Sequence, residues 1–141
     1  MSLKYPNSTV NFSASPAHAL TPFQVYDRDE WENYLSKYDP SNFVEIEPLF
    51  NEYFFKVKNK NYNVHHKAVV MFSLEKALLT KNYNFAELLE SDDETCFYFP
   101  YNWKIEKPRN FFKSIYGLMF ENWGSEVINS GYKILPPNEI L

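Results

Sequence analysis

Apolar side chains recur at helical spacing along most of the chain, which predicts a mainly helical protein. The clearest stripe lies in residues 64–81, where apolar residues follow one another three or four positions apart: Val64, Ala68, Met71, Leu74 and Leu78. Further apolar positions widen this stripe at Val70, Phe72 and Ala77. We therefore expect residues 64–81 to form a central helix that neighbouring elements cover on several sides.

A first helix is predicted over residues 28–38. Asp27 and Glu30 have the spacing of a capping box, in which two side chains satisfy the free N–H groups at a helix start. The helical stripe that follows consists of Trp31, Tyr34, Leu35 and Tyr38. Asp39-Pro40 should end this helix, because proline disfavours helical geometry in the residue before it.

A second helix follows, with Asn42 and Glu45 repeating the capping spacing. Its apolar face consists of Phe43, Ile46, Phe50, Tyr53, Phe54 and Val57. Pro48 leaves two alternatives: the helix begins near Pro48, where a first-turn proline is tolerated, or it is kinked there. Residues 56–61 form a polar, basic exit from this helix.

The second half of the chain predicts shorter and longer helical pieces. Asn84 and Glu87 predict a short capped helix through residue 89. Pro108 suits the first turn of a helix with a long apolar stripe that Gly124 should end or bend. Ser125 should cap a last turn to Ser130, and Gly131 suits a left-handed terminator.

Three segments do not show helical spacing. Residues 1–26 contain three prolines and read as an extended arm with a short strand around residues 9–12. Residues 95–105 are aromatic and strand-like, with Pro100 confining them to a sheet edge, and residues 132–135 are also strand-like. The prediction is one domain over residues 1–141, mainly α with five or six helices and a minor β element. The alternative is an α+β domain with a small antiparallel sheet built from these segments.

Composition excludes several classes of protein. The chain has 141 residues, a formal charge of −4 and 27 aromatic residues, so it can form a core and is not a disordered tail. The lone Cys96 excludes an internal disulfide framework, a CxxC pair and a multi-cysteine zinc site. No apolar run is long enough for a signal peptide or a membrane span, so a cytoplasmic protein is expected.

The modest net charge conceals large charged blocks. Residues 27–52 carry −6, residues 53–86 carry +5, and residues 87–94 carry −5 with no base. Many acids in the first block suit helix starts, whereas like charges at the end of a short helix are unfavourable. Blocks of this size create a field that steers a charged partner. The same carboxylates repel phosphates, which argues against direct nucleic-acid binding.

The acidic run of residues 87–94 is followed by aromatic residues that we expect to be partly exposed. Rings that anchor and carboxylates that pair with Lys or Arg are typical of a surface that meets a basic protein. The predicted partner-binding residues are therefore Glu87, Glu90, Asp92, Asp93, Glu94, Tyr98, Tyr101 and Trp103.

No catalytic, cofactor or metal site is predicted. Adjacent His65 and His66 point about 100° apart on a helix and do not form an i, i+4 metal pair. Cys96 lies beside Phe97 and is expected to be a small buried hydrophobe. The chain has three glycines and no glycine-rich phosphate motif.

In general character the chain resembles the immunity proteins of bacterial toxin–immunity systems, including contact-dependent growth inhibition and related polymorphic toxins. The resemblance rests on size, acidity, aromatic abundance, low cysteine content and the acidic-aromatic run of residues 90–98. It includes no diagnostic motif, so no functional residue carries over. It implies a non-enzymatic antitoxin that binds and neutralises a cognate basic toxin such as a nuclease.

Two alternatives belong to other classes. An enzyme of unrecognised class would use His65 or His66 with a distant carboxylate, and it would need a pocket that holds both. A structural protein, for instance phage-encoded, would act through self-association and would bury its surplus aromatic residues at a symmetric interface. The oligomeric state does not follow from the sequence.

Overall fold

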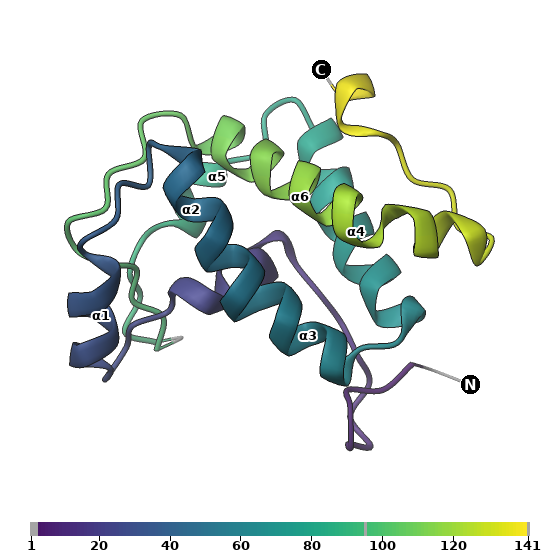
Figure 1. The fold of residues 1–141 in the computed structure, drawn as a ribbon, viewed down its shortest axis with the longest axis horizontal. Coiled ribbons are helices and arrows are strands. Elements are labelled where there is room, and N and C mark those ends of the chain that lie inside the picture. The colour runs from purple at the N-terminus through teal and green to yellow at the C-terminus, as the bar shows by residue number, and fades with distance from the viewer. Residues whose placement is uncertain (1–2, 95, 141) are drawn as a thin grey trace.

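The computed structural model describes residues 3–94 and 96–140. The described part contains six α-helices, with a π-helical segment between two of them and two short 3-10 helices. Figure 1 shows how they lie: the long helix α6 (Pro108–Asn129) packs against α4 (Val64–Leu79), and the helix that includes α2 and α3 crosses beside them. The prediction of a mainly helical fold is confirmed.

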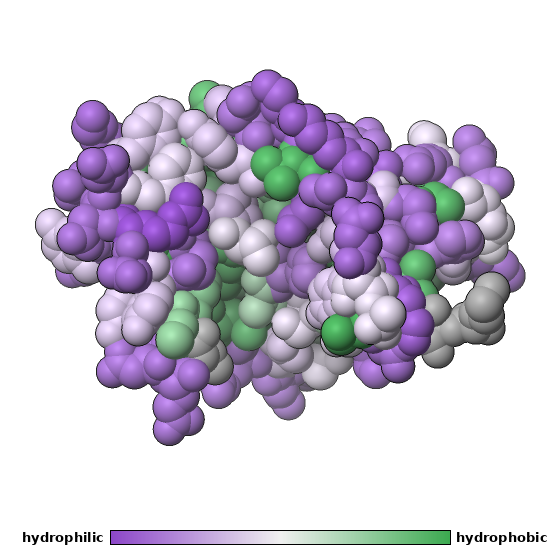
Figure 2. Space-filling view, turned by 90° about the horizontal axis from the view of Figure 1, so that it is seen from below, coloured by the Kyte–Doolittle hydropathy of each residue, from purple (hydrophilic) through white to green (hydrophobic). Residues whose placement is uncertain are grey.

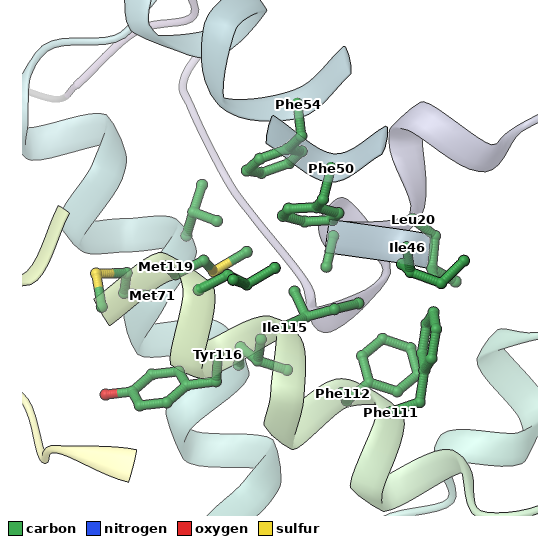
Figure 3. Packing of buried hydrophobic residues seen from close by; sticks show 14 of the residues in the cluster. Leu20, Ile46, Phe50, Phe54, Met71, Phe111, Phe112, Ile115, Tyr116 and Met119 are labelled. Carbon is green, nitrogen blue, oxygen red and sulfur yellow. The ribbon is translucent and has the colours of Figure 1, made fainter. Parts of the chain in front are cut away.

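A hydrophobic core fills the space between these helices. Figure 3 shows Phe50 and Phe54 facing Met71 of α4 and Ile115 and Met119 of α6, and all five side chains are fully buried. Most of the aromatic residues at helical spacing contribute to this core, as the stripe pattern predicts. Phe50 stacks on Phe54 with 4.5 Å between ring centroids, so the rings pack on one another as well as against aliphatic groups.

The second helix begins before Pro48 and continues past it. α2 (Phe43–Phe50) is capped by Asn42, whose side chain accepts the Val44 N–H at 3.2 Å. A π-helical segment (Asn51–Phe55) and α3 (Lys56–Asn61) continue the same helix. Proline cannot donate a backbone hydrogen bond and crowds the preceding turn, and a widened π turn accommodates such a defect. The helix therefore absorbs the proline rather than starting at it.

The prediction that the last long helix ends or bends at Gly124 is wrong. The helix runs unbroken through Gly124 to Asn129, so there is no separate turn capped by Ser125. A Cβ at Gly124 would lie 3.2 Å from the Phe120 ring, so any larger residue at this position would crowd that ring. Gly131 has φ +100° and terminates the helix as predicted, while Tyr132 N–H donates to the Val127 carbonyl.

The predicted extended arm is partly helical. Its residues Pro16–Phe23 form a 3-10 helix that inserts Leu20 and Phe23 fully into the core. Prolines suit this helix because it is short and its first turn needs no donor. Residues 3–12 fold back on themselves through a single bridge between Lys4 and Asn11, in place of the expected strand.

α1 (Asp29–Leu35) is shorter than predicted. Arg28 is its N-cap and forms no side-chain cap, so the expected capping box of Asp27 and Glu30 does not form. Asp27 instead has φ +54°, a turn conformation that an aspartate tolerates. α5 (Phe85–Leu88) follows prediction, and Asn84 accepts the Glu87 N–H.

The described residues contain isolated bridges but no sheet, so the small antiparallel sheet of the alternative fold is not observed. Within the strand-like segment 95–105, Thr95 lies outside the described residues. The backbone groups of Tyr98 and Tyr101 pair with segments other than a strand: Val25 N–H donates to the Tyr98 carbonyl, and Tyr101 N–H donates to Glu32. Residues 132–135 are also not a strand.

Figure 2 shows one face, on which hydrophilic residues predominate and hydrophobic residues come to the surface in a hollow near the middle. In the described part of the chain, no helix is both long and apolar enough to cross a membrane.

Candidate binding surface

A tight turn organises the predicted binding residues. Asp92 and Phe97 pair across it through two backbone hydrogen bonds of 2.7 and 3.1 Å. The Asp92 side chain also accepts the Glu94 N–H at 2.9 Å. We call residues 92–97 the acidic turn. It presents Asp93 and Glu94 at its tip, and both are exposed.

Three of the predicted acids lie on one side of the acidic turn. Glu87, Glu90 and Asp92 line an open hollow of about 650 Å³. Its apolar lining comes from Ala17, Leu88 and Phe97. The acids on α5 and the acidic turn thus face a common depression, which charge and apolar surface share.

Tyr98 lies on the other side, against the segment that leads into α1. Its ring meets Tyr26 edge-on with centroids 5.1 Å apart, and its hydroxyl donates to the Asp93 carboxylate. That hydrogen bond raises the pKa of Tyr98. The pKa of Tyr26 is raised by Cys96, through a hydrogen bond and its charge, and also by the negative charges of Asp27 and Asp93. Asp27 directly follows Tyr26, and Asp93 accepts from Tyr98, so the contact between these two rings brings together acids that are 66 positions apart in the sequence.

Tyr101 lies along α1 and is 81% exposed. Its backbone N–H donates to Glu32 at 3.0 Å, and the neighbouring Asn102 side chain donates to the Ser36 carbonyl. Residues 98–103 therefore form a strap on α1, visible beside it in Figure 1. The strap and the Tyr26–Tyr98 contact bring residues 26–32 next to the acidic turn.

Trp103 is not part of this surface, which corrects the prediction. Its side chain is 6% exposed and packs against Phe23 and Phe99. The indole N–H donates to the Leu35 carbonyl at 2.9 Å. The tryptophan therefore anchors the strap to the core, and a partner cannot reach its ring.

Cys96 is exposed, whereas the sequence predicted a buried residue. Its φ of +54° places it at a turn position that points away from the core. Its thiol lies 3.7 Å from the Asp93 carbonyl. Adjacent Phe97 is half-buried and takes the packing role instead.

The assembled surface is strongly negative. Residues 27–32 and 87–94 together carry nine carboxylates and one base, Arg28. Within the described residues two ion pairs form, Lys56–Glu52 and Lys67–Glu126, and both lie outside these two segments. The two segments therefore carry a formal net charge of −8.

Sequence reasoning missed a group of aromatic residues beside this surface. Trp31, Tyr34 and Tyr38 were assigned to a helix stripe, but all three are only half-buried, and Tyr53 joins them from the π-helical segment. α1 has only Leu35 fully buried, while Trp31 and Tyr34 pack against the core with one part of each ring and leave the other part exposed. Trp31 and Tyr34 on this seven-residue helix have polar ring edges and are flanked by acids, and Tyr38 follows shortly after; this pattern is the signal that could have identified them.

The histidines of the enzyme alternative hold structural positions. His66 Nδ1 accepts the Asn63 N–H at 3.1 Å, so its Nε2 carries the proton and donates to the Lys4 carbonyl at 2.6 Å. His65 Nδ1 pairs with the Tyr132 hydroxyl. Among the described residues, no three His, Cys, Asp or Glu side chains are grouped to hold a metal ion.

His18 gives the fold a pH dependence. Burial and then the charge of Lys58 lower its pKa to about 4, and its Nε2 lies 2.7 Å from the Tyr62 hydroxyl. The unfolded chain therefore takes up this proton below its ordinary pKa of about 6.5, before the folded protein does, and stability falls as pH drops.

We expect the free energy of unfolding to fall by about 1 kcal/mol from His18 alone between about pH 7.5 and about pH 5, since solvent screens a partly exposed ring. Urea unfolding of the protein and of His18→Gln over this range measures it. The glutamine variant should have a flatter pH profile; parallel profiles would contradict the assignment.

No family model, curated protein or solved structure matches this chain.

Proposed function

We propose that this protein is a non-enzymatic inhibitor that binds a basic protein, and that it acts as an immunity protein which neutralises a cognate toxin in the bacterial cytoplasm. A toxin nuclease fits this proposal, because an enzyme that binds nucleic acid carries a basic surface around its active site. The observation that supports it most strongly is the meeting of two acidic segments, residues 27–32 and 87–94, around exposed tyrosine rings.

In this proposal, carboxylates and tyrosine rings contribute to binding in different ways. Carboxylates at the acidic turn raise the rate of encounter with a basic partner, because their field extends about a Debye length into solvent. Tyr98 and Tyr101 supply flat contact area with a polar end, as anchors of protein interfaces commonly do. The same negative field opposes a nucleic-acid ligand.

The proposal predicts that the cognate toxin is encoded beside this protein, and the test measures association with that neighbouring gene product by stopped flow. The variant Asp92→Asn, Asp93→Asn, Glu94→Gln should associate at least about tenfold more slowly at low salt, with little change in the dissociation rate. The difference should shrink at high salt because ions screen the field. Asparagine keeps the side-chain oxygen that accepts within the turn, so the turn should survive.

A matched control changes the net charge equally at other exposed positions: Glu106→Gln, Glu121→Gln and Glu139→Gln. It should associate nearly as fast as the unaltered protein. Equal slowing by both triple variants would reduce the effect to net charge and remove the acidic turn from the interface. Failure to form a complex with the neighbouring toxin would contradict the inhibitor function itself.

A further inference from the structure

The missed aromatic residues form two walls of an open hollow. Trp31 and Tyr34 stack nearly parallel, with an interplanar angle of 10° and 5.3 Å between centroids. Tyr53 meets Trp31 edge-on at 4.7 Å and 73°. The hollow has a volume of about 610 Å³. Two ring surfaces at a steep angle make a corner that a flat group can enter.

The corner is held in place before any ligand arrives. The Trp31 indole N–H donates to the Pro22 carbonyl at 3.0 Å, which fixes the ring against the 3-10 helix. The Tyr38 hydroxyl donates to the Tyr34 hydroxyl at 3.0 Å, which ties the ring of Tyr34 to the turn that follows α1. A ligand would therefore bind preformed walls and would lose less free energy in ordering them.

The remaining lining defines the charge of the occupant. Asp27, Asp29 and Glu30 surround the rings, and neither of the two ion pairs in the described residues involves them. Aromatic faces attract cations through their quadrupoles, and carboxylates add direct attraction. The combination favours a cation and opposes an anion.

Arg28 shows which cation the ring surface accepts. Its guanidinium lies over Trp31, 5.4 Å from the ring centroid, and donates to the Gln24 carbonyl at a long 3.4 Å. The protein thus already stacks a guanidinium on this tryptophan with little else to hold it. A guanidinium from outside could replace it and bond the neighbouring carboxylates through its edge.

We propose that this hollow binds an arginine side chain of the partner protein and that Arg28 occupies the Trp31 face until the partner arrives. Arginine is favoured over lysine because a planar guanidinium stacks on a ring while its N–H groups point at carboxylates in the same plane. The partner's identity as a basic protein rests on the proposed function. Asp27 lines the hollow and directly follows Tyr26, whose ring contacts Tyr98 beside the acidic turn, so the hollow and the acidic turn are neighbours on the surface.

The test needs no toxin. The isotope-labelled protein is titrated with N-acetyl-L-arginine amide, and the indole N–H signals of its three tryptophans are followed by NMR. The Trp31 signal should shift to saturation, while those of Trp103 and Trp123, both buried, stay in place. The N-acetyl-L-citrulline amide has the same shape without the charge and should produce little shift.

Variants separate the parts of the site. Arg28→Gln should tighten binding about two- to fivefold, because one exposed cation–π contact no longer competes. Asp29→Asn with Glu30→Gln should weaken it. Tyr53→Ser, which removes a wall, should weaken it more than Tyr53→Phe, which keeps the ring; unchanged Trp103 and Trp123 signals will show that each variant is folded.

A Trp31 signal that does not move up to tens of millimolar arginine amide would overturn the proposal, as would equal shifts with the citrulline amide. Joint movement of all three indole signals would indicate a general ionic effect and would also overturn it. These outcomes leave the inhibitor function standing, since the acidic-turn variant tests that separately. Conversely, a saturable arginine response without toxin binding would refute the inhibitor function alone.

Discussion

Trp103→Ala is expected to lower the free energy of unfolding by about 3–5 kcal/mol, the range for removing a large buried aromatic side chain. The indole is 6% exposed and contacts Phe23 and Phe99 at centroid distances of 5.2 and 5.4 Å. Its loss also removes one of the two hydrogen bonds to the Leu35 carbonyl at the end of α1, which then keeps only the Tyr38 N–H as a donor. Both the cavity and the lost hydrogen bond destabilise the protein.

Urea unfolding followed by circular dichroism at a helix-sensitive wavelength measures this effect without relying on tryptophan fluorescence. Trp103→Phe keeps much of the ring and should lose about 1–2 kcal/mol, mainly the hydrogen bond and part of the packing. Tyr101→Ala is the surface control and should change stability by no more than about 0.5 kcal/mol. Similar losses for Trp103→Ala and Tyr101→Ala would contradict the assignment of these neighbours to core and surface.

Arg109→Ala is expected to lower the free energy of unfolding by about 2–4 kcal/mol, because hydrogen bonds to a charged group contribute more than neutral ones. The guanidinium donates to the carbonyls of Leu78, Thr80 and Lys81 at 2.9, 2.9 and 3.0 Å. These carbonyls lie at the C-terminal end of α4, where a helix favours a cation. The same guanidinium lies 5.0 Å from the Phe85 ring centroid, so it also joins α5 to the first turn of α6.

Arg109→Lys tests whether geometry or charge is responsible. Lysine keeps the positive charge at the helix end but lacks the planar fork, so it should recover less than half of the lost stability. Full recovery by lysine would assign the effect to charge alone. An alanine variant within about 0.5 kcal/mol of the unaltered protein would show that this arginine is not a stabilising link between the helices.

Periodicity predicted the elements whose signal is local. The stripe over residues 64–81 corresponds to α4, and the caps at Asn42 and Asn84 form as predicted. Gly131 terminates α6 because only a residue without a side chain adopts φ +100° at low cost. These features depend on neighbours a few positions away, which is why the sequence is sufficient for them.

Predictions failed where distant contacts decide. Gly124 is a helix breaker by propensity, yet it stays helical because its neighbours Trp123 and Val127 are buried in the core, where Trp123 packs against Phe54. The prolines of residues 16–23 predict an extended segment, but the burial of Leu20 and Phe23 in the core stabilises a 3-10 helix there. The aromatic run after residue 95 has strand propensity but meets α1 rather than another strand, so no sheet forms in the described residues.

The candidate site shows the same division. The sequence identified an acidic block and the rings beside it, and it placed Tyr98 and Tyr101 at the surface, where they lie. The sequence could not distinguish Trp103 from these two tyrosines, because all three are aromatic residues in one short run. Which ring is buried depends on the distant segments that pack against it. It placed Trp31 and Tyr34 on the stripe of the first helix without including them in the binding surface, since a stripe on a short helix does not reveal how much of each ring is covered.

By itself, the sequence determined the helical class, the local caps and the segregation of charge into blocks, because each follows from residues close together in the chain. Only the tertiary structure packed Tyr26 against Tyr98 beside the acidic turn, buried Trp103 and opened the corner between Trp31 and Tyr53. Those facts depend on which segments meet after the core has formed. Charge and ring content are properties of composition, whereas a binding surface is a property of arrangement.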